Sequence, residues 1–288
     1  MEVFSSIIKR DGEIQAMLMR WSDEFGNRSV AKRQGLESHC SRHVTAMSEN
    51  FRNQAYIEHV RRLEQRIDCK DEAMRLAVGG EFDAVGKLEY YLLRSLGLGS
   101  GHLVIDVGCG SGRLAQQLAH DKSIRYVGTD VVPRLLESAK ASTGRNDWEF
   151  HLVEGIRIPC PDDVADFVTF FSVLTHTTHE ESFQYLRESA RCLKPGGQAV
   201  VSFLEFRIPC HWETFKLSLK AKPGGPLTQF IDRDGLTAWA SNSGLMVESF
   251  FDGDKGHFPI PEEIKWENGT VMKSLGNLGQ SVGVLRKV

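Results

Sequence analysis

Three closely spaced glycines follow an aspartate in a segment that could hold a ligand. Residues 106–112 read D-V-G-C-G-S-G and lie between an apolar run and a helical pattern, where glycines allow a tight turn and close backbone approach. A dinucleotide fingerprint would need a glycine at Arg113, so NAD is disfavoured. Asp106 would repel a phosphate but suits an ammonium group. The segment therefore predicts a cationic, nucleoside-like ligand.

A second acid, Asp130, ends the next apolar run along the chain. A carboxylate at this place can accept hydrogen bonds from both hydroxyls of a ribose, which requires a free 2′-OH. Taken alone, Asp130 could equally be a helix N-cap, and a lone glycine loop is generic turn chemistry. A third acid, Glu154, follows the third run.

Histidine pairs do not predict a metal site. His176 and His179 are three residues apart, but no third ligand accompanies them, and capping or surface placement is favoured. His39 and His43 share a helical face, which is more often packing than coordination. We therefore expect no metal.

The elements that position these residues alternate from residue 103 onward. Apolar runs bounded by turn residues predict strands, and the segments between them carry helical spacing. The expected strands are 103–105, 124–129, 148–153, 166–171, 198–204, 245–251 and 281–285, and the expected helices are 113–120, 133–141, 178–192 and 234–243. This rhythm is typical of an α/β fold with a parallel sheet covered by helices on both faces. The last two strands lack a helical crossover and should be antiparallel neighbours.

Residues 1–85 are expected to form an N-terminal helical lid or cap region, because Ile57, Val60 and Leu63 follow helical spacing and strand signals are scarce. Residues 86–288 are expected to form the ligand-binding domain. An aromatic insertion at 205–231 interrupts its rhythm and should cover the side of the domain where a small organic molecule binds, and 252–279 should be a loop.

Composition excludes several function classes for the 288-residue chain. The 35 basic and 38 acidic residues give a net charge of −3, without the basic excess that nucleic acid or an anionic membrane would attract. The longest uncharged stretches, such as 167–179, hold 13 residues, too few to span a bilayer. The N-terminus does not read as a signal peptide, and six scattered cysteines are typical of a reducing compartment. We expect a cytoplasmic protein.

Several segments together resemble a class I S-adenosylmethionine-dependent methyltransferase of the small-molecule type. They are the D-x-G-x-G-x-G loop at 106–112, Asp130, Glu154 ahead of I-x-I-P, the run D-F-V-x-x-F-S-V-L-x-H at 166–176 and L-K-P-G-G at 193–197. The resemblance spans about 82–286. It implies a Rossmann-like seven-stranded sheet in the order 3-2-1-4-5-7-6, with the last strand antiparallel.

The resemblance also implies a set of residues that bind S-adenosyl-L-methionine. Gly108, Gly110 and Gly112 would line its methionine part, and Asp106 would support that loop and face the sulfonium or amine. Asp130 would hold the ribose and Glu154 the adenine amino group, although most members carry aspartate there. Neighbouring positions complete the expected cofactor site: Cys109, Val131, Gly155, Phe171 and Ser172.

The expected reaction is methylation of a small organic acceptor, with a hydroxyl of a natural product or sugar favoured. Transfer from a sulfonium is an in-line displacement that mainly needs positioning, but a hydroxyl acceptor gains from a general base. His176 and His211 lead the candidates as catalytic residues; His179, His257 and Glu205 are further ones. N- or C-methylation and a non-catalytic nucleoside-binding or scaffold role stay open, as does homo-oligomerisation.

Overall fold

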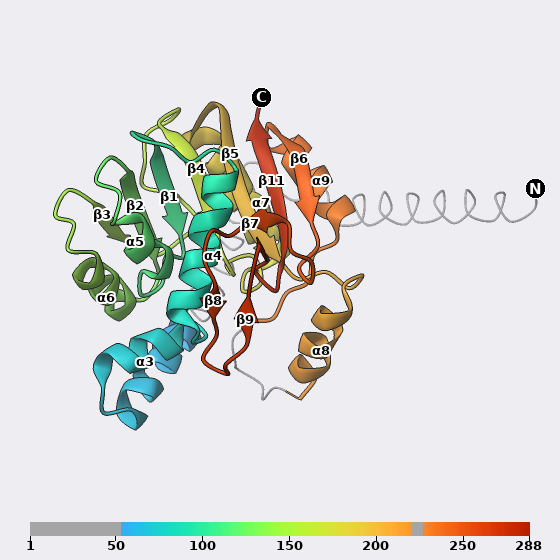
Figure 1. Ribbon diagram of the computed structural model, residues 1–288. Helices are drawn as coiled ribbons and strands as arrows, with labels where there is room; N and C mark the ends of the chain where they lie inside the picture. The colour runs from blue at the N-terminus through green and yellow to red at the C-terminus, as the bar shows by residue number, and fades with distance from the viewer. Residues whose placement is uncertain (1–52, 221–226) are drawn as a thin grey trace, which may run out of the picture. The chain divides into compact units, whose positions relative to one another are not determined.

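A seven-stranded sheet forms the centre of the computed structural model, which describes residues 53–220 and 227–288 (Figure 1). Its strands are β1 (Leu103–Val107), β2 (Arg125–Asp130), β3 (Glu149–Leu152), β4 (Ala165–Phe170), β5 (Leu193–Phe203), β6 (Leu245–Phe251) and β11 (Ser281–Lys287). Their order is β3-β2-β1-β4-β5-β11-β6. β1 to β5 pair in parallel, and β11 is antiparallel to β5 and β6. The predicted order and the antiparallel last strand are confirmed.

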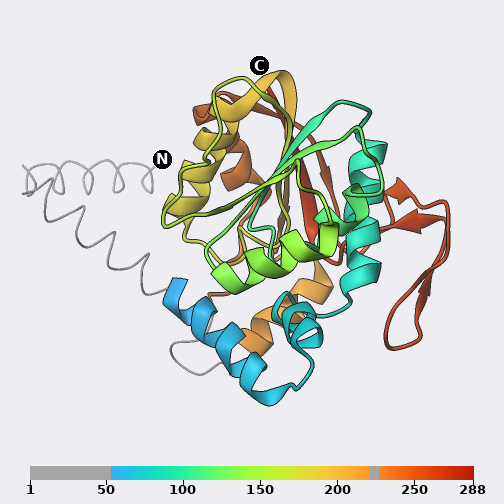
Figure 2. The same ribbon diagram turned by 90° about the vertical axis from the view of Figure 1, so that its left-hand side faces the viewer.

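Helices cover both faces of the sheet, as expected (Figures 1 and 2). On one face lie α4 (Phe82–Ser95), α5 (Arg113–Leu118) and α6 (Pro133–Thr143), and on the other α7 (His179–Cys192) and α9 (Arg233–Asn242). Successive side chains of a strand point to opposite faces. Val104 therefore packs with Leu88 of α4, whereas Ile105 packs with Leu186 of α7.

Helical residues precede the sheet in the chain. Residues 53–66 are helical, and α3 (Lys70–Ala77) follows them. Val60 and Met74 are buried with Val132 and Leu135 at the start of α6. Residues 1–52 of the expected lid lie outside the described residues, and the expected boundary at 85/86 falls inside α4.

Two stretches hold elements that were not expected. The insertion after β5 contains α8 (Pro209–Ser218). The expected loop at 252–279 contains two short ladders, β7 (Phe258–Pro259) with β10 (Leu275–Gly276) and β8 (Ile264–Lys265) with β9 (Val271–Met272). Their buried side chains, such as Phe258 and Ile264, belong to the same apolar cluster as α4. Two-residue strands are too short to produce a periodic pattern in the sequence.

Gly86 lets α4 and α5 approach closely. A Cβ atom at Gly86 would lie 2.6 Å from the Arg113 carbonyl oxygen, which is backbone and cannot rotate away. Because Arg113 is the first residue of α5 and follows the glycine loop directly, this contact fixes the loop against α4.

We predict that Gly86→Ala lowers the free energy of unfolding by roughly 1–3 kcal/mol, because the added methyl group must push α4 away from α5. Denaturant unfolding measures the change. Gly235→Ala is the matched control, because nothing lies within 4 Å of its Cβ position and alanine favours its helix. A Gly86→Ala protein as stable as the parent chain would contradict the close approach.

Candidate active site

The glycine loop between β1 and α5 adopts a conformation that needs its glycines. Gly108, Gly110 and Gly112 have φ angles of +67°, +56° and +89°, where other residues are strained. A Cβ atom at Gly108 would lie 2.6 Å from Val173, and one at Gly110 would lie 2.6 Å from Val78. The loop is therefore packed against protein on both sides, and its backbone is the part left to approach a ligand.

Asp130, the last residue of β2, holds this loop. Its carboxylate accepts hydrogen bonds from the Gly110 and Val132 amides, each at 2.9 Å. Burial raises the pKa of Asp130 to about 6, against the effect of these amide hydrogen bonds, which lower it. Each carboxylate oxygen keeps a further lone pair, so the group can still accept from ligand hydroxyls.

Asp106 lies beneath the loop and is almost fully buried. It accepts hydrogen bonds from the Tyr126 and Thr169 hydroxyls, each at 2.8 Å. Burial, and then the charge of Glu89, raise the pKa of Asp106 to about 7. Glu89 itself pairs with Arg113 at 2.8 Å. Asp106 is thus placed to support the loop, and its contact with a ligand amine stays a prediction.

The carboxyl ends of β3 and β4 bring the other expected cofactor residues to the same edge of the sheet. Glu154 and Gly155 follow β3, and the Glu154 side chain is exposed. Phe171 and Ser172 follow β4. Ser172 has a φ of +61°, an uncommon conformation for a residue with a side chain, and its hydroxyl accepts from Gln280 at 2.9 Å.

His176 is oriented by a backbone carbonyl. Its Nδ1 lies 2.6 Å from the Leu227 carbonyl oxygen, so Nδ1 carries the hydrogen and Nε2 has the lone pair. Burial lowers the pKa of His176, which keeps the ring neutral near pH 7. A neutral imidazole with a lone pair on Nε2 is what a general base requires.

His211 has a different environment. It is buried at 1% exposure in α8, with Nδ1 3.0 Å from the Glu205 amide and Nε2 3.2 Å from the Gly279 carbonyl oxygen. Nδ1 also lies 3.1 Å from the Glu205 carbonyl oxygen. The neutral tautomer with the hydrogen on Nε2 satisfies both the Gly279 carbonyl and the Glu205 amide, and then neither nitrogen keeps an unused lone pair. Both ring nitrogens of His211 thus face backbone partners, and the catalytic roles expected for His176 and His211 stay predictions.

The N-terminal helices contact the glycine loop directly. The Ser111 hydroxyl donates to the Met74 carbonyl at 3.0 Å, and Arg113 donates to the Val78 carbonyl at 3.2 Å. The ring of Tyr56 meets His176 edge-on, with 5.4 Å between centroids. Sequence reasoning found the helical spacing here but missed Tyr56 and Val78, because spacing alone does not say which element a side chain faces.

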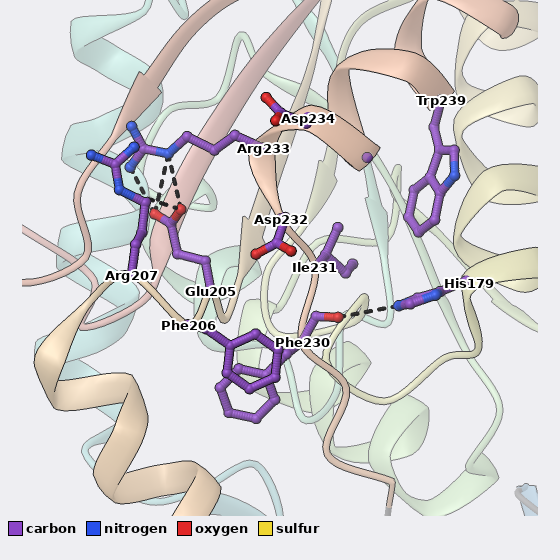
Figure 3. A pocket seen from close by; sticks show the side chains of 11 residues that line it. His179, Glu205, Phe206, Arg207, Phe230, Ile231, Asp232, Arg233, Asp234 and Trp239 are labelled. Carbon is purple, nitrogen blue, oxygen red and sulfur yellow. Dashed lines mark hydrogen bonds and ion pairs between the residues drawn. The ribbon is translucent and has the colours of Figure 1, made fainter. Parts of the chain in front are cut away.

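A cavity of about 550 Å³ lies beside the insertion after β5 (Figure 3). The rings of Phe206 and Phe230 stack at 4.6 Å on one side, and His179 and Trp239 lie on the other. Arg233 forms an ion pair of 2.7 Å with the buried Glu205 at a third side. None of the residues expected to bind the cofactor lines this cavity.

Within residues 53–220 and 227–288, no group of three His, Cys, Asp or Glu side chains is arranged to hold a metal ion. In the same part of the chain, every helix is too short or too polar to cross a bilayer.

Comparisons with known proteins agree with the geometry. Residues 105–201 match the family model described as a methyltransferase domain. Methyltransferase GfsG of Streptomyces halstedii is 32% identical over 136 residues, 46% of this chain and 46% of that protein. The 27-O-demethylrifamycin SV methyltransferase of Amycolatopsis mediterranei is 26% identical over 175 residues, 59% of this chain and 63% of that protein. The matches thus span less than two thirds of these relatives.

Solved structures show the same fold. Magnesium protoporphyrin IX methyltransferase from Synechocystis PCC 6803, determined with bound S-adenosylhomocysteine (SAH), aligns with a TM-score of 0.54 at 16% identity. The alignment covers 85% of this chain and all of that one. At this identity the likeness concerns the fold alone.

The buried carboxyl of Asp106 predicts a pH dependence of stability. Its pKa in the folded chain, about 7, lies above the ordinary value of 3.8, so the folded chain keeps a proton that the unfolded chain releases. Binding of this proton stabilises the folded state, and the stabilisation is lost as pH rises through 7. We expect Asp106→Asn to lose less unfolding free energy than the parent chain between about pH 5 and 8.

Denaturant midpoints across this range test the prediction. The raised pKa values of Asp130 and Glu89 also lower the unfolding free energy as pH rises, and the lowered pKa of His176 raises it. All three groups are present in the variant as well as in the parent chain. Asp147→Asn is the control, since the pKa of this exposed group is about 2 and it does not titrate here. Equal pH slopes in Asp106→Asn and the parent chain would refute the assignment.

Proposed function

We propose, from the premise that this chain contains a class I S-adenosylmethionine-dependent methyltransferase domain, that it methylates a hydroxyl of a small organic acceptor such as a natural product or sugar. S-adenosyl-L-methionine is the methyl donor. The observation that carries the proposal is the Asp130 carboxylate, held at the rim of the glycine loop by the Gly110 amide at 2.9 Å. The site thus combines a hydrogen-bond acceptor for the ribose of the cofactor with a loop whose backbone can approach its methionine part.

The residues present fit this cofactor. Gly108, Cys109, Gly110 and Gly112 would line its methionine part, Asp130 and Val131 its ribose. At the neighbouring strand end, the exposed Glu154 can accept hydrogen bonds from the adenine amino group. The remaining candidates at this edge of the sheet are Asp106, Gly155, Phe171 and Ser172. When bound, the cofactor supplies an electrophilic methyl group on its sulfonium.

Three parts of the fold would serve the acceptor: a histidine after β4, the cavity after β5 and the N-terminal cap. His176 follows β4 at the carboxyl edge of the sheet and offers Nε2 to a hydroxyl proton. The cavity after β5 would bind the body of the acceptor, because its aromatic rings can cover a small organic molecule while its charged side chains can hold polar groups. The N-terminal cap, whose Met74 and Val78 contact the loop, would exclude water.

Similar proteins support a hydroxyl acceptor. The Amycolatopsis relative is named for methylation at a 27-O position, and a relative from Xanthomonas euvesicatoria, 29% identical over 158 residues, is a ubiquinone biosynthesis O-methyltransferase. With a net charge of −3, this chain has no bulk charge that favours nucleic acid as the acceptor. Homo-oligomerisation and a cytoplasmic location stay predictions.

The ribose role of Asp130 can be isolated with two ligands. We expect Asp130→Asn to weaken SAH binding roughly 10- to 100-fold, because a charge-assisted hydrogen bond contributes about 1.5–3 kcal/mol. Calorimetry with SAH and with its 2′-deoxy analogue separates this loss from a disturbed loop. The analogue should be affected less, and equal weakening of both ligands would sink the ribose role.

The base role of His176 predicts a loss of turnover without a loss of cofactor affinity. Asparagine at position 176 can still donate to the Leu227 carbonyl but has no basic nitrogen. His176→Asn should therefore reduce the rate of SAH formation roughly 10²- to 10⁴-fold. The substrate is a hydroxyl compound that the parent chain methylates, found in a panel of phenols and sugars. SAH affinity should change little.

His211→Asn is the matched control for this experiment. It should lower the unfolding free energy by about 1–3 kcal/mol, since buried backbone groups lose a partner, but should spare turnover per folded molecule. Full turnover by His176→Asn at every pH would show that positioning alone suffices or that another base acts.

A further inference from the structure

Tyr56 is placed between the two halves of the proposed site. It belongs to the helical residues 53–66, which precede the sheet by many residues in the chain, yet its ring contacts His176 beyond β4. The ring planes are inclined by 74° and their centroids are 5.4 Å apart, a favourable edge-to-face arrangement. The helix thus reaches across the carboxyl edge of the sheet.

His176 is held from two directions. The Leu227 carbonyl oxygen lies 2.6 Å from Nδ1 and fixes that nitrogen, while Tyr56 restricts rotation of the ring plane. A hydrogen bond alone leaves an imidazole free to tilt about the bond axis. The edge-on ring contact opposes such a tilt and so favours one direction of Nε2.

Tyr56 also lies near Asp130, the residue expected to bind the cofactor's ribose. Burial, and then the nearby Asp130 carboxylate, raise the pKa of the Tyr56 phenol above its ordinary value, so the hydroxyl stays protonated. Tyr56 packs in the apolar cluster that contains Val131 and Val132, the two residues after Asp130. An ion pair of 2.8 Å between Glu64 and Arg134 of α6 anchors the same helix.

We propose that Tyr56 is a positioning residue that couples occupancy of the cofactor site to the orientation of the His176 imidazole. A nucleoside whose ribose is held by Asp130 would bind next to Val131 and Val132, which belong to the same apolar cluster as Tyr56. Because the imidazole is confined between this ring and a carbonyl, a displacement of Tyr56 changes the direction of Nε2. The inference rests on the proposed function for the ligand and for the role of His176.

Nitrogen chemical shifts of the full chain, labelled with nitrogen-15 at histidine, test the coupling at one pH. His176→Asn assigns the His176 signals. Adding SAH to the parent chain should shift them. Tyr56→Phe keeps the ring edge and should keep this response, whereas Tyr56→Leu should lose more than about half of it. Tyr56→Met, which has bulk but no ring, should behave like Tyr56→Leu and serves if that variant does not fold.

Tyr90→Leu is the matched control, because it removes a half-buried tyrosine of α4 whose ring partner is Tyr91. It should leave the response intact. A folded Tyr56→Leu or Tyr56→Met protein that binds SAH with the full His176 response would overturn the coupling alone. Failure of the parent chain to bind SAH in calorimetry would overturn the proposed function and the coupling with it. The ligand-free His176 shifts of the Tyr56 variants would still show whether the ring contact exists.

Discussion

The hydrogen bond from the Gly110 amide to the Asp130 carboxylate is the contact on which the site depends. It joins the end of β2 to the loop after β1, and it forms only if the loop takes the left-handed conformations that its glycines permit. Asp106, near the end of β1, ties this strand to β2 and β4 through the hydroxyls of Tyr126 and Thr169. The backbone is thereby prearranged before any ligand binds, which lowers the entropy cost of binding.

The N-terminal helices complete this arrangement rather than sit apart from it. Met74 and Val78 contact the loop that the later strands position, and Tyr56 continues from there to His176. A cap that contacts both cofactor and acceptor residues can exclude water from both at once. We therefore expect the same segment to contribute to binding and to the orientation of the reacting groups.

Sequence patterns predicted the strands of a parallel sheet and its antiparallel last pair, because buried parallel strands and glycine turns leave local signals. The strand order came from the family resemblance, since local patterns do not say which strands are neighbours. Sequence patterns did not predict α8, whose Trp212 and Leu217 are exposed and form no buried stripe, or the two-residue strands near Phe258. The sequence also could not distinguish His176 from His211, since both follow strands in the chain. Only the tertiary contacts show which backbone groups face the ring nitrogens of each.

Hydrogen exchange of the full chain with and without SAH tests the central claim most directly. Binding at the glycine loop under the N-terminal cap predicts slower exchange of amides at 108–112 and 130–132 together with 53–78, because all three segments meet around Asp130. Unchanged exchange of these segments at saturating SAH, or protection confined to regions away from the glycine loop, would contradict the account.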